Sequence, residues 1–327
     1  MTRRRSLLAT LLAGPALATP ALAQPAWSPS RPLRIIVPFP AGGSFDVQAR
    51  LLAEGLAPAL GQPVVVENRP GAGGTIGAAE VAHAAPDALT LLMGSNGTQA
   101  ANVTLYQGRL PYDPARDHQP ITLVTVQPQI VAVGDAWPAE RTLPGLLAAL
   151  RARGEPTPFG SSGTGSPTHL AGEMFGRALG VTLTHVPYRG QGPALNDLMG
   201  GRLGLMFPSV ADVLGQLRAG RVFALAAMSD HRLALLPEVP TLAELGHPSL
   251  TSSIWAGLFT RAGSPPAAIA RLNAEVVKLL QAPALRGRLE AQGFEVLPGT
   301  PDALATRQAE DTARLGEVIR ASGATAD

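Results

Sequence analysis

The sequence uses one local pattern twice, and this repetition constrains the fold more than any other feature. Each copy is an apolar strand, then a loop rich in Gly, Ser and Thr, then an amphipathic helix. The first copy spans Leu33–Leu60 and the second spans Pro158–Gly180. A strand that leads through a short loop into a helix is the repeating unit of a parallel sheet covered by helices. The pattern therefore predicts an α/β fold.

The two loops also predict a binding function. The first N–H groups of a helix have no partner within the helix, and the helix dipole adds partial positive charge there. Such a helix start can hold an anion without a Lys or Arg side chain. Because the two copies lie in different parts of the chain, we expect them to clamp one small carboxylate.

The order of the expected elements indicates two lobes in this 327-residue chain. Two long β-rich runs, Ile121–Val133 and Ser253–Thr260, bracket a middle region of alternating strands and helices. The chain would cross to a second lobe at the first run and return at the second. We expect lobe 1 to comprise residues 24–126 plus 256–327, and lobe 2 to comprise residues 127–255. Both Gly/Ser loops follow strand ends, so both should line the cleft between the lobes.

Individual elements can be placed from hydrophobic periodicity. The expected strands of the first lobe are Leu33–Val37, Pro63–Val66 and Thr90–Met93. The expected C-terminal helices are Pro266–Gln281, Pro283–Gln292 and Pro301–Ala321. The predicted fold class is α/β with two mixed or parallel sheets, helices on both faces of each sheet, and two crossing strands.

The N-terminal segment 1–23 has the features of a secretory signal peptide. Three arginines are followed by an apolar stretch with helix breakers and a small-x-small end, which predicts cleavage near Ala23/Gln24 and a periplasmic location. The Sec and twin-arginine export routes both stay open. Of the 26 Lys and Arg residues three lie in this segment, which leaves 23 against 24 Asp and Glu residues. The mature chain is thus slightly acidic, which argues against a nucleic-acid partner.

The composition also limits the chemistry that the chain can perform. Cysteine is absent, which excludes thiol catalysis, thiolate metal sites and a lipid-anchored N-terminal cysteine. The six histidines are scattered, without the paired spacing of a metal site. We therefore expect no metal and no cofactor.

Several motifs resemble the Bug-type periplasmic solute-binding proteins, the receptors of tripartite tricarboxylate transporters. The resemblance rests on Leu33–Asp46 and Gly61–Gly74 near the N-terminus, and it extends over nearly the whole mature chain in the order of the family. The further matching segments are Leu110–Pro114, Phe159–Gly163, His169–Glu173, His185–Gly190, Pro193–Leu198, Leu236–Leu242 and Arg271–Glu275.

The resemblance implies a type II-like periplasmic-binding-protein fold that closes over a carboxylated metabolite. It also implies that segments 40–46 and 161–168 grip one carboxylate through N–H groups, hydroxyls and bound water. Phe45 departs from the family, which often has a small residue there, and its ring could restrict ligand size. The implied partners are a small carboxylate and membrane transporter subunits or a sensor ectodomain, with the receptor itself a monomer.

The candidate ligand-binding residues follow from the loops and from the other strand ends. Ser162 and Thr164 are the better candidates of the second loop, since Ser166 before Pro167 fits a helix N-cap. Asp46 has two readings, a first-turn carboxylate favoured by the helix dipole or an acceptor for a ligand or the opposite lobe. The full set is Phe39, Ala41, Gly42, Gly43, Ser44, Phe45, Asp46, Ser95, Asn96, Thr98, Ser161, Ser162, Gly163, Thr164, Ser166, Thr168, Tyr188, Ser209 and Asp212.

The alternative function is an α/β enzyme, hydrolytic or nucleotide-dependent, that uses the same helix starts for an anionic substrate. The glycines of Gly71–Gly77 do not have the spacing of a dinucleotide-binding loop. No Gly-x-Ser-x-Gly motif is present, and the sequence offers no evident general base beside Ser161 or Ser162. The predicted function is therefore a non-enzymatic receptor.

Overall fold

A computed structural model describes residues 27–135, 137 and 141–326. The predicted signal peptide, residues 1–23, and its cleavage site lie outside these residues. In the part of the chain that is described, no helix combines the length and the apolar character that a membrane span requires.

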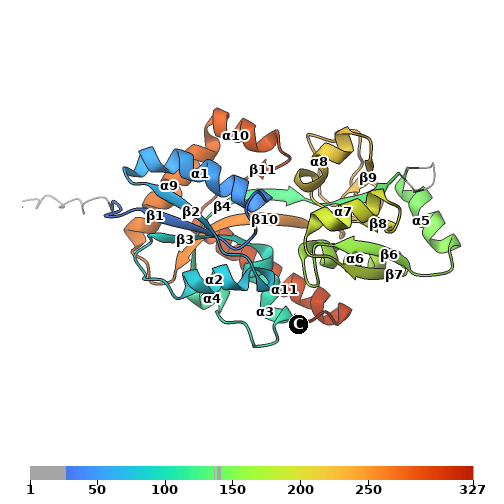
Figure 1. Cartoon of the computed structure of the whole chain (residues 1–327), viewed down its shortest axis with the longest axis horizontal. Coiled ribbons are helices and arrows are strands. Elements are labelled where there is room, and N and C mark those ends of the chain that lie inside the picture. The colour runs from blue at the N-terminus through green and yellow to red at the C-terminus, as the bar shows by residue number, and fades with distance from the viewer. Residues whose placement is uncertain (1–26, 136, 138–140, 327) are drawn as a thin grey trace, which may run out of the picture.

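The chain forms two separate sheets, as Figure 1 shows. The first sheet has the strand order β11-β4-β10-β3-β1-β2. Its parallel half is made of β2 (Val64–Asn68), β1 (Leu33–Val37) and β3 (Thr90–Ser95). Its antiparallel half is made of β10 (Ser253–Arg261), β4 (His118–Pro128) and β11 (Glu295–Val296).

The second sheet is built from the middle of the chain, in the order β7-β6-β8-β5-β9. Strand β6 (Thr157–Ser161) lies between β7 (Leu183–Pro187) and β8 (Leu205–Met206), and all three are parallel. Strand β5 (Ile130–Gly134) is antiparallel to both of its neighbours, β8 and the edge strand β9 (Val222–Ala227). Both sheets are thus mixed, as predicted.

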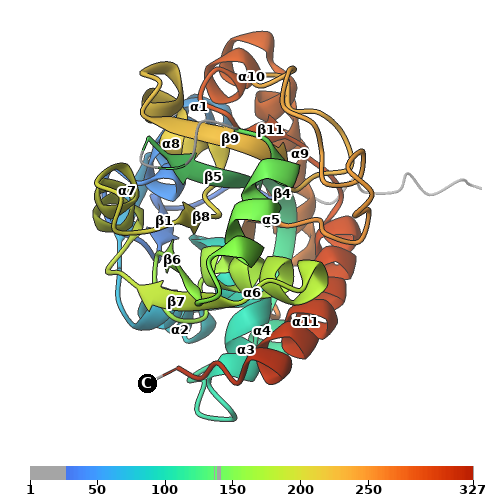
Figure 2. The same ribbon diagram turned by 90° about the vertical axis from the view of Figure 1, so that its right-hand side faces the viewer.

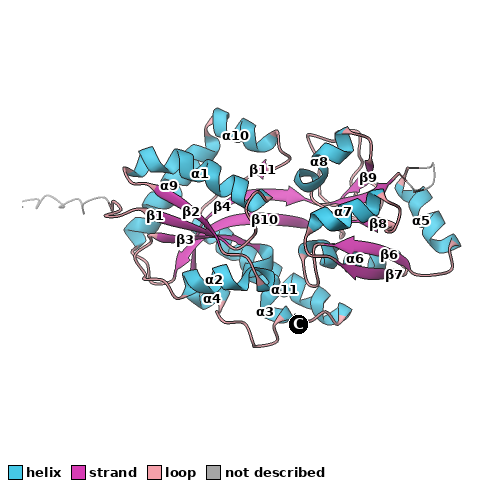
Figure 3. Ribbon diagram, viewed as in Figure 1, coloured by secondary structure: helices cyan, strands magenta, loops and turns pink. Residues whose placement is uncertain are grey.

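Helices cover both sheets (Figure 3). Those of the first lobe are α1 (Ser44–Leu60), α2 (Thr75–Ala82), α3 (Asn102–Leu105), α4 (Pro114–Asp117), α9 (Pro266–Gln281), α10 (Pro283–Glu290) and α11 (Pro301–Ser322), with the short 3-10 helix η1 (Ala72–Gly74) and the short π-helix η2 (Gly97–Ala101). Those of the second lobe are α5 (Leu143–Ala152), α6 (Pro167–Leu179), α7 (Gln191–Met199) and α8 (Val210–Arg218).

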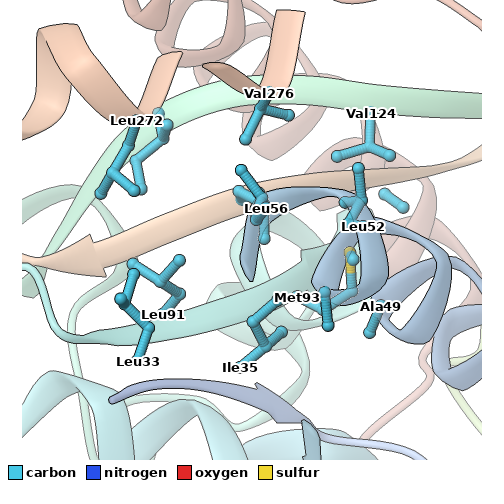
Figure 4. Packing of buried hydrophobic residues seen from close by; sticks show 14 of the residues in the cluster. Leu33, Ile35, Ala49, Leu52, Leu56, Leu91, Met93, Val124, Leu272 and Val276 are labelled. Carbon is cyan, nitrogen blue, oxygen red and sulfur yellow. The ribbon is translucent and has the colours of Figure 1, made fainter. Parts of the chain in front are cut away.

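The alternation of side chains along β1 explains why helices cover both faces of the first sheet. Ile35 packs in a core with Leu52 and Leu56 of α1 and Leu272 of α9 (Figure 4). The next residue, Ile36, packs on the opposite face in a cluster that includes residues of α2 and α11. Each fully buried Leu or Ile contributes about 1.5–3 kcal/mol to folding.

The two crossings between the sheets meet at Gln129. The predicted β-rich run Ile121–Val133 divides here, since β4 ends at Pro128 and β5 begins at Ile130. The N–H of Gln129 donates to Ser252 O (3.0 Å), and the Ser252 hydroxyl donates to Gln129 Oε1 (2.7 Å). Ser252 directly precedes β10. These bonds continue the antiparallel pairing of β4 with β10, so the outgoing and returning segments stay joined where they pass between the two sheets.

A second contact between the lobes lies along the C-terminal helix. Helix α11 packs against α6, as Figure 2 shows. Leu315 and Ile319 of α11 form a buried cluster with Leu170 of α6 and Leu105 of α3. The C-terminal helix thus spans the lobe junction, beyond the predicted packing on the first lobe alone.

Candidate functional site

The predicted site residues gather at the carboxyl ends of parallel strands. The first loop, residues 38–43, follows β1, and the second loop, residues 162–166, follows β6. The neighbours β3, β7 and β8 end at the same edges and carry the remaining candidates. In Figure 1 the N-terminal end of α1 points toward the second lobe and that of α6 toward the first. The candidates of the two lobes therefore lie on facing edges.

The first loop leaves the start of α1 open. Gly43 is its N-cap and supplies no side-chain hydrogen bond, and the first helical bond runs from Val47 N–H to Gly43 O (3.0 Å). The N–H groups of Ser44, Phe45 and Asp46 have no acceptor among the described residues. Three donors therefore lie at the positive end of the helix dipole.

Asp46 stabilises the first loop itself. Its side chain is buried and accepts from the Gly42 N–H (2.8 Å) and from Arg50 Nε (2.9 Å). Burial opposes ionisation, yet the Arg50 guanidinium and the Gly42 N–H together hold the pKa of Asp46 below its ordinary value. Gly42 has φ +79°, a conformation that glycine adopts at low cost. The carboxylate thus fixes the glycine turn.

Phe39 and Phe45 form an aromatic pair beside the first loop. Their ring centroids lie 4.5 Å apart. Phe45 belongs to the core of the first lobe and is 7% exposed, and Phe39 packs against the same core. Ala211 of α8 packs there too. The Phe45 ring is thus largely covered, while Ala41 and the two glycines of the loop are exposed.

The second loop is organised by side chains. The Ser166 hydroxyl accepts from His169 N–H (3.3 Å), so Ser166 is the N-cap of α6 and Pro167 occupies the next position, as predicted. Thr168 Oγ1 accepts from Ser162 N–H (2.9 Å) and lies 3.1 Å from Ser162 Oγ and 3.0 Å from Ser166 Oγ. Thr164 is exposed, and its hydroxyl has no partner among the described residues. Hydroxyl groups therefore crowd the start of α6.

Two histidines lie under the second loop, which the sequence did not indicate. The rings of His169 and His185 stack with centroids 3.7 Å apart. His169 Nδ1 accepts from Gly165 N–H (3.0 Å), and His185 Nε2 lies 2.6 Å from Ser161 Oγ. Burial, followed by the neighbouring His169, lowers the pKa of His185 to about 4. The two rings meet because β6 and β7 pair in parallel, and the sequence pattern did not predict that pairing.

The pair Ser161–His185 is the arrangement that a hydrolase would need. Ser161 is fully buried, however, and its Oγ also accepts from Gly163 N–H (3.1 Å). No carboxylate of the described residues bonds to His185 Nδ1, and an imidazole with so low a pKa is a weak general base at neutral pH. The pair therefore holds the loop in shape.

Two of the candidate residues at the end of β3 form hydrogen bonds with each other. Thr98 Oγ1 accepts from Ser95 N–H (3.0 Å), and Ser95 Oγ accepts from Thr98 N–H (3.2 Å). Asn96 donates through Nδ2 to Ser253 O (2.8 Å) at the start of β10, while its buried Oδ1 has no partner among the described residues. Ser95 and Thr98 thus shape the turn, and Asn96 retains a free acceptor.

The remaining candidates lie beside the second loop. The Tyr188 hydroxyl donates to Asp197 Oδ2 (2.7 Å), and Ser209 is the N-cap of α8 through Asp212 N–H (3.3 Å). Gln129 Nε2 donates to Phe207 O (2.6 Å) and lies 3.3 Å from Pro167 O. This single amide therefore places the start of α8 next to the start of α6.

Two surface grooves lie away from these loops. One is on the second lobe, among α8, β9 and residues 235–239, and the other separates α6 from α11. Neither is lined by a predicted site residue. In the described residues, no group of three or more His, Asp or Glu side chains is placed to hold a metal ion. We therefore identify the candidate site by the N–H and hydroxyl groups of the two loops.

The comparisons with known proteins decide the family. The family described as "Tripartite tricarboxylate transporter family receptor" matches residues 48–324. The chain belongs to this family. Protein BugT of Bordetella pertussis is 37% identical over 296 residues, which are 90% of this chain and 90% of BugT. The resemblance noted in the sequence is confirmed.

Solved structures support the same assignment. Rpa4515 of R. palustris, solved with adipate, superposes with a TM-score of 0.83 at 32% identity and covers 91% of this chain and 99% of its own. MatC (Rpa3494) from Rhodopseudomonas palustris, solved with bound malate, has a TM-score of 0.79 at 35% identity, with 89% and 99% covered. The two-lobed periplasmic-binding-protein fold is therefore confirmed.

Proposed function

We propose that this family receptor works in the periplasm and captures a small carboxylate between its lobes. The observation that supports this most is the uncapped start of α1, where the N–H groups of Ser44 and Phe45 lack acceptors among the described residues. Relatives of the same fold were solved with adipate and malate, both of which carry carboxylates. A carboxylate is the acceptor that such donors favour.

In this proposal the two loops supply different kinds of hydrogen-bond donor to the ligand. The first loop supplies backbone N–H groups, and the second supplies the hydroxyls of Ser162, Thr164 and Thr168. Ser161, Ser166 and Asp46 hold the loops in shape through their hydrogen bonds. Ser95 and Thr98 do the same for the turn after β3.

We also propose that the lobes close about Gln129. The proposed lobe boundaries are residues 24–126 plus 256–327 and residues 127–255, and each sheet falls almost wholly in one lobe. Closure would replace the hydration shell of the ligand with N–H and hydroxyl donors. The closed receptor would then dock, as a monomer, on membrane transporter subunits or on a sensor ectodomain.

The proposal excludes catalysis. The hydrolytic alternative needs an accessible nucleophile with a base, and Ser161, the hydroxyl partner of His185, is fully buried. A receptor, in contrast, needs only hydrogen-bond donors that face one anion. Binding without turnover is therefore the expected behaviour.

A thermal-shift screen tests the proposed function. The mature chain, from Gln24, is heated with malate, adipate, succinate, citrate, butanoate, aspartate, glutamate and, as a neutral control, glucose. A carboxylate at one hundred times its Kd should stabilise the folded chain by about 2.7 kcal/mol and raise the Tm by several degrees. NMR of the same mixtures after a day should show unchanged ligand. Absence of a shift with every acid, or formation of product, would contradict the proposal.

A further inference from the structure

One carboxyl group beside the second loop lacks a counter-charge. Asp212 lies in the first turn of α8, and its Oδ2 accepts from the Ser209 hydroxyl (2.8 Å). Among the described residues its Oδ1 has no hydrogen-bond partner, and no Lys, Arg or His of that part of the chain forms an ion pair with it. The dipole at the start of α8 favours a carboxylate there, but burial of that carboxylate without a cation still costs free energy. The hydrogen bond with Ser209 therefore accounts for only one of the two carboxylate oxygens of Asp212.

The surroundings of Asp212 are polar but uncharged. The amide of Gln191, the first residue of α7, lies close to Asp212, and both its Nε2 and Oε1 are buried without a partner among the described residues. Gln127 Oε1 lies 3.4 Å from Ser209 Oγ, while its buried Nε2 is equally unpartnered. We call Gln127, Gln191, Ser209 and Asp212 the distal cluster. It holds free acceptors and free amide donors but no cation.

The distal cluster lies deep between the lobes and next to the second loop. Ala211, beside Asp212, packs against the first-lobe core, and the backbone of Gly293 also approaches Ala211. Asp212 nevertheless retains accessible surface. Because Gln129 ties the start of α8 to the start of α6, a ligand held at the second loop can extend into this cluster.

The charge balance differs between the two ends of the site. At the first loop, Arg50 lies 2.9 Å from Asp46 and neutralises it. At the distal cluster the carboxyl has no such partner, so a second ligand carboxylate would meet a like charge. An ammonium group brings the opposite charge and three donors, which Asp212 Oδ1 and Gln191 Oε1 can accept.

We propose that Asp212, with Gln191, selects a ligand that carries a cationic amino group in addition to the carboxylate held by the loops. This inference rests on the proposed function of the loops and narrows the ligand to amino-acid-like zwitterions. The free Nε2 of Gln127 would donate to a ligand oxygen, which a zwitterion also carries. Burial raises the pKa of Asp212, and the side chains of Ser209 and Gln191 oppose this rise; a bound ammonium group would oppose it further by favouring the charged carboxylate.

Calorimetry with matched ligand pairs tests the inference. Each pair differs by one amino group: aspartate with succinate, glutamate with glutarate, 4-aminobutanoate with butanoate, and 6-aminohexanoate with hexanoate. In the mature wild-type chain, at least one amine should bind ten or more times more tightly than its nitrogen-free partner. In Asp212→Asn this preference should fall to about twofold, while the nitrogen-free acid binds at least as tightly as before.

The variants are chosen so that the fold is kept. The amide oxygen that Asp212→Asn introduces can still accept from Ser209, and Asp302→Asn, at an exposed position in α11, is the matched control. Gln191→Met removes the whole amide, including the second acceptor, and should reduce the preference severalfold. A preference for the nitrogen-free acids, or one that survives in both variants, would overturn the inference and leave the receptor intact. Failure of every acid to bind would overturn the receptor proposal together with it.

Discussion

The two helix starts arise from the same sequence pattern, yet they present different donors. The start of α1 has no side-chain cap, and the N–H groups of Ser44, Phe45 and Asp46 lack acceptors among the described residues. The start of α6 has Pro167, which carries no N–H, and Ser166, which accepts from His169 N–H. One start therefore offers backbone donors, and the other offers hydroxyls.

The difference shows that a shared motif does not imply a shared role. The first loop is held from within by a carboxylate, through the bond between Gly42 N–H and Asp46 (2.8 Å). The second loop is held by neutral groups, through Thr168 Oγ1 and His169 Nδ1. Charge stabilises the loop whose helix start stays open, while hydroxyls stabilise the loop whose helix start is capped. The predictions below test this contrast.

The largest effect is expected at the carboxylate of the first loop. Asp46→Ala removes the acceptor of Gly42 and leaves Arg50 without its acid, which should lower the free energy of unfolding by about 2–3 kcal/mol. Most of this loss comes from the Gly42 bond, because Arg50 is largely exposed and screened by solvent. Urea denaturation measures it. The matched change in the second loop, Ser166→Ala, should cost about 1 kcal/mol. A larger loss for Ser166→Ala would reverse the comparison.

A smaller effect should appear on acidification, and of the two loops only the second should contribute to it between pH 6.5 and 4. His118 of the first lobe, whose pKa burial also lowers to about 4, should add the same loss to every variant. The pKa of His185 is lowered to about 4, so the unfolded chain binds a proton between pH 6.5 and 4 that the native chain does not. Stability is thus complete above pH 6.5 and falls as the pH drops toward 4. His185 should contribute about 2 kcal/mol to this loss of unfolding free energy. This is less than the whole change in its pKa implies, because the ring is partly exposed to solvent.

Denaturation of His185→Gln and of the wild type, at intervals from pH 7.5 to 4, isolates this share. The variant should lose less stability than the wild type over that range. Asp46→Asn, in contrast, should retain the acid sensitivity of His185. An unchanged pH profile in His185→Gln would show that the imidazole does not couple the second loop to pH.

The smallest effect concerns two glycines with positive φ. A Cβ added to Gly42 (φ +79°) would have nothing within 4 Å, whereas a Cβ on Gly165 (φ +71°) would lie 2.4 Å from Leu105 Cδ1 of the first lobe. Gly42→Ala should cost about 1 kcal/mol of backbone strain. Gly165→Ala should cost about 1 kcal/mol more, because Leu105 must also move. Equal Tm values for the two variants would mean that the second loop does not touch the first lobe.

Much of the fold could be predicted because periodicity and turn residues are local signals. Strand β1 has the predicted bounds Leu33–Val37, and α9 has the predicted bounds Pro266–Gln281. Helix α1 begins at Ser44, directly after the two glycines of the first loop. Strand β2 runs over Val64–Asn68, later than the expected Pro63–Val66, because pairing with β1 extends it through Glu67 and Asn68.

The parts that could not be predicted depend on contacts between distant residues. Nothing near Gln129 in sequence indicates that it bonds Ser252 and Phe207. The stacking of His169 on His185 follows from the pairing of β6 with β7. The local signals did locate the loops and the Ser166 cap, but the roles of the individual side chains are set by these long-range contacts.

A double-mutant cycle tests most directly whether both helix starts act on one carboxylate. Ser44→Pro removes one N–H donor at a position that favours proline, since the preceding Gly43 is extended (φ −76°, ψ 169°). Ser44→Ala keeps the N–H and is its control. The second-loop variant is Ser162→Ala with Thr164→Val, and the ligand is the best acid of the thermal-shift screen.

Calorimetry should show that Ser44→Pro weakens binding about tenfold relative to Ser44→Ala, with little change in Tm. The second-loop variant should weaken binding about tenfold relative to the wild type. If both starts hold the same carboxylate, the combined variant should depart from additivity by more than about 0.5 kcal/mol. Additive losses, or an affinity that neither change alters, would contradict the account.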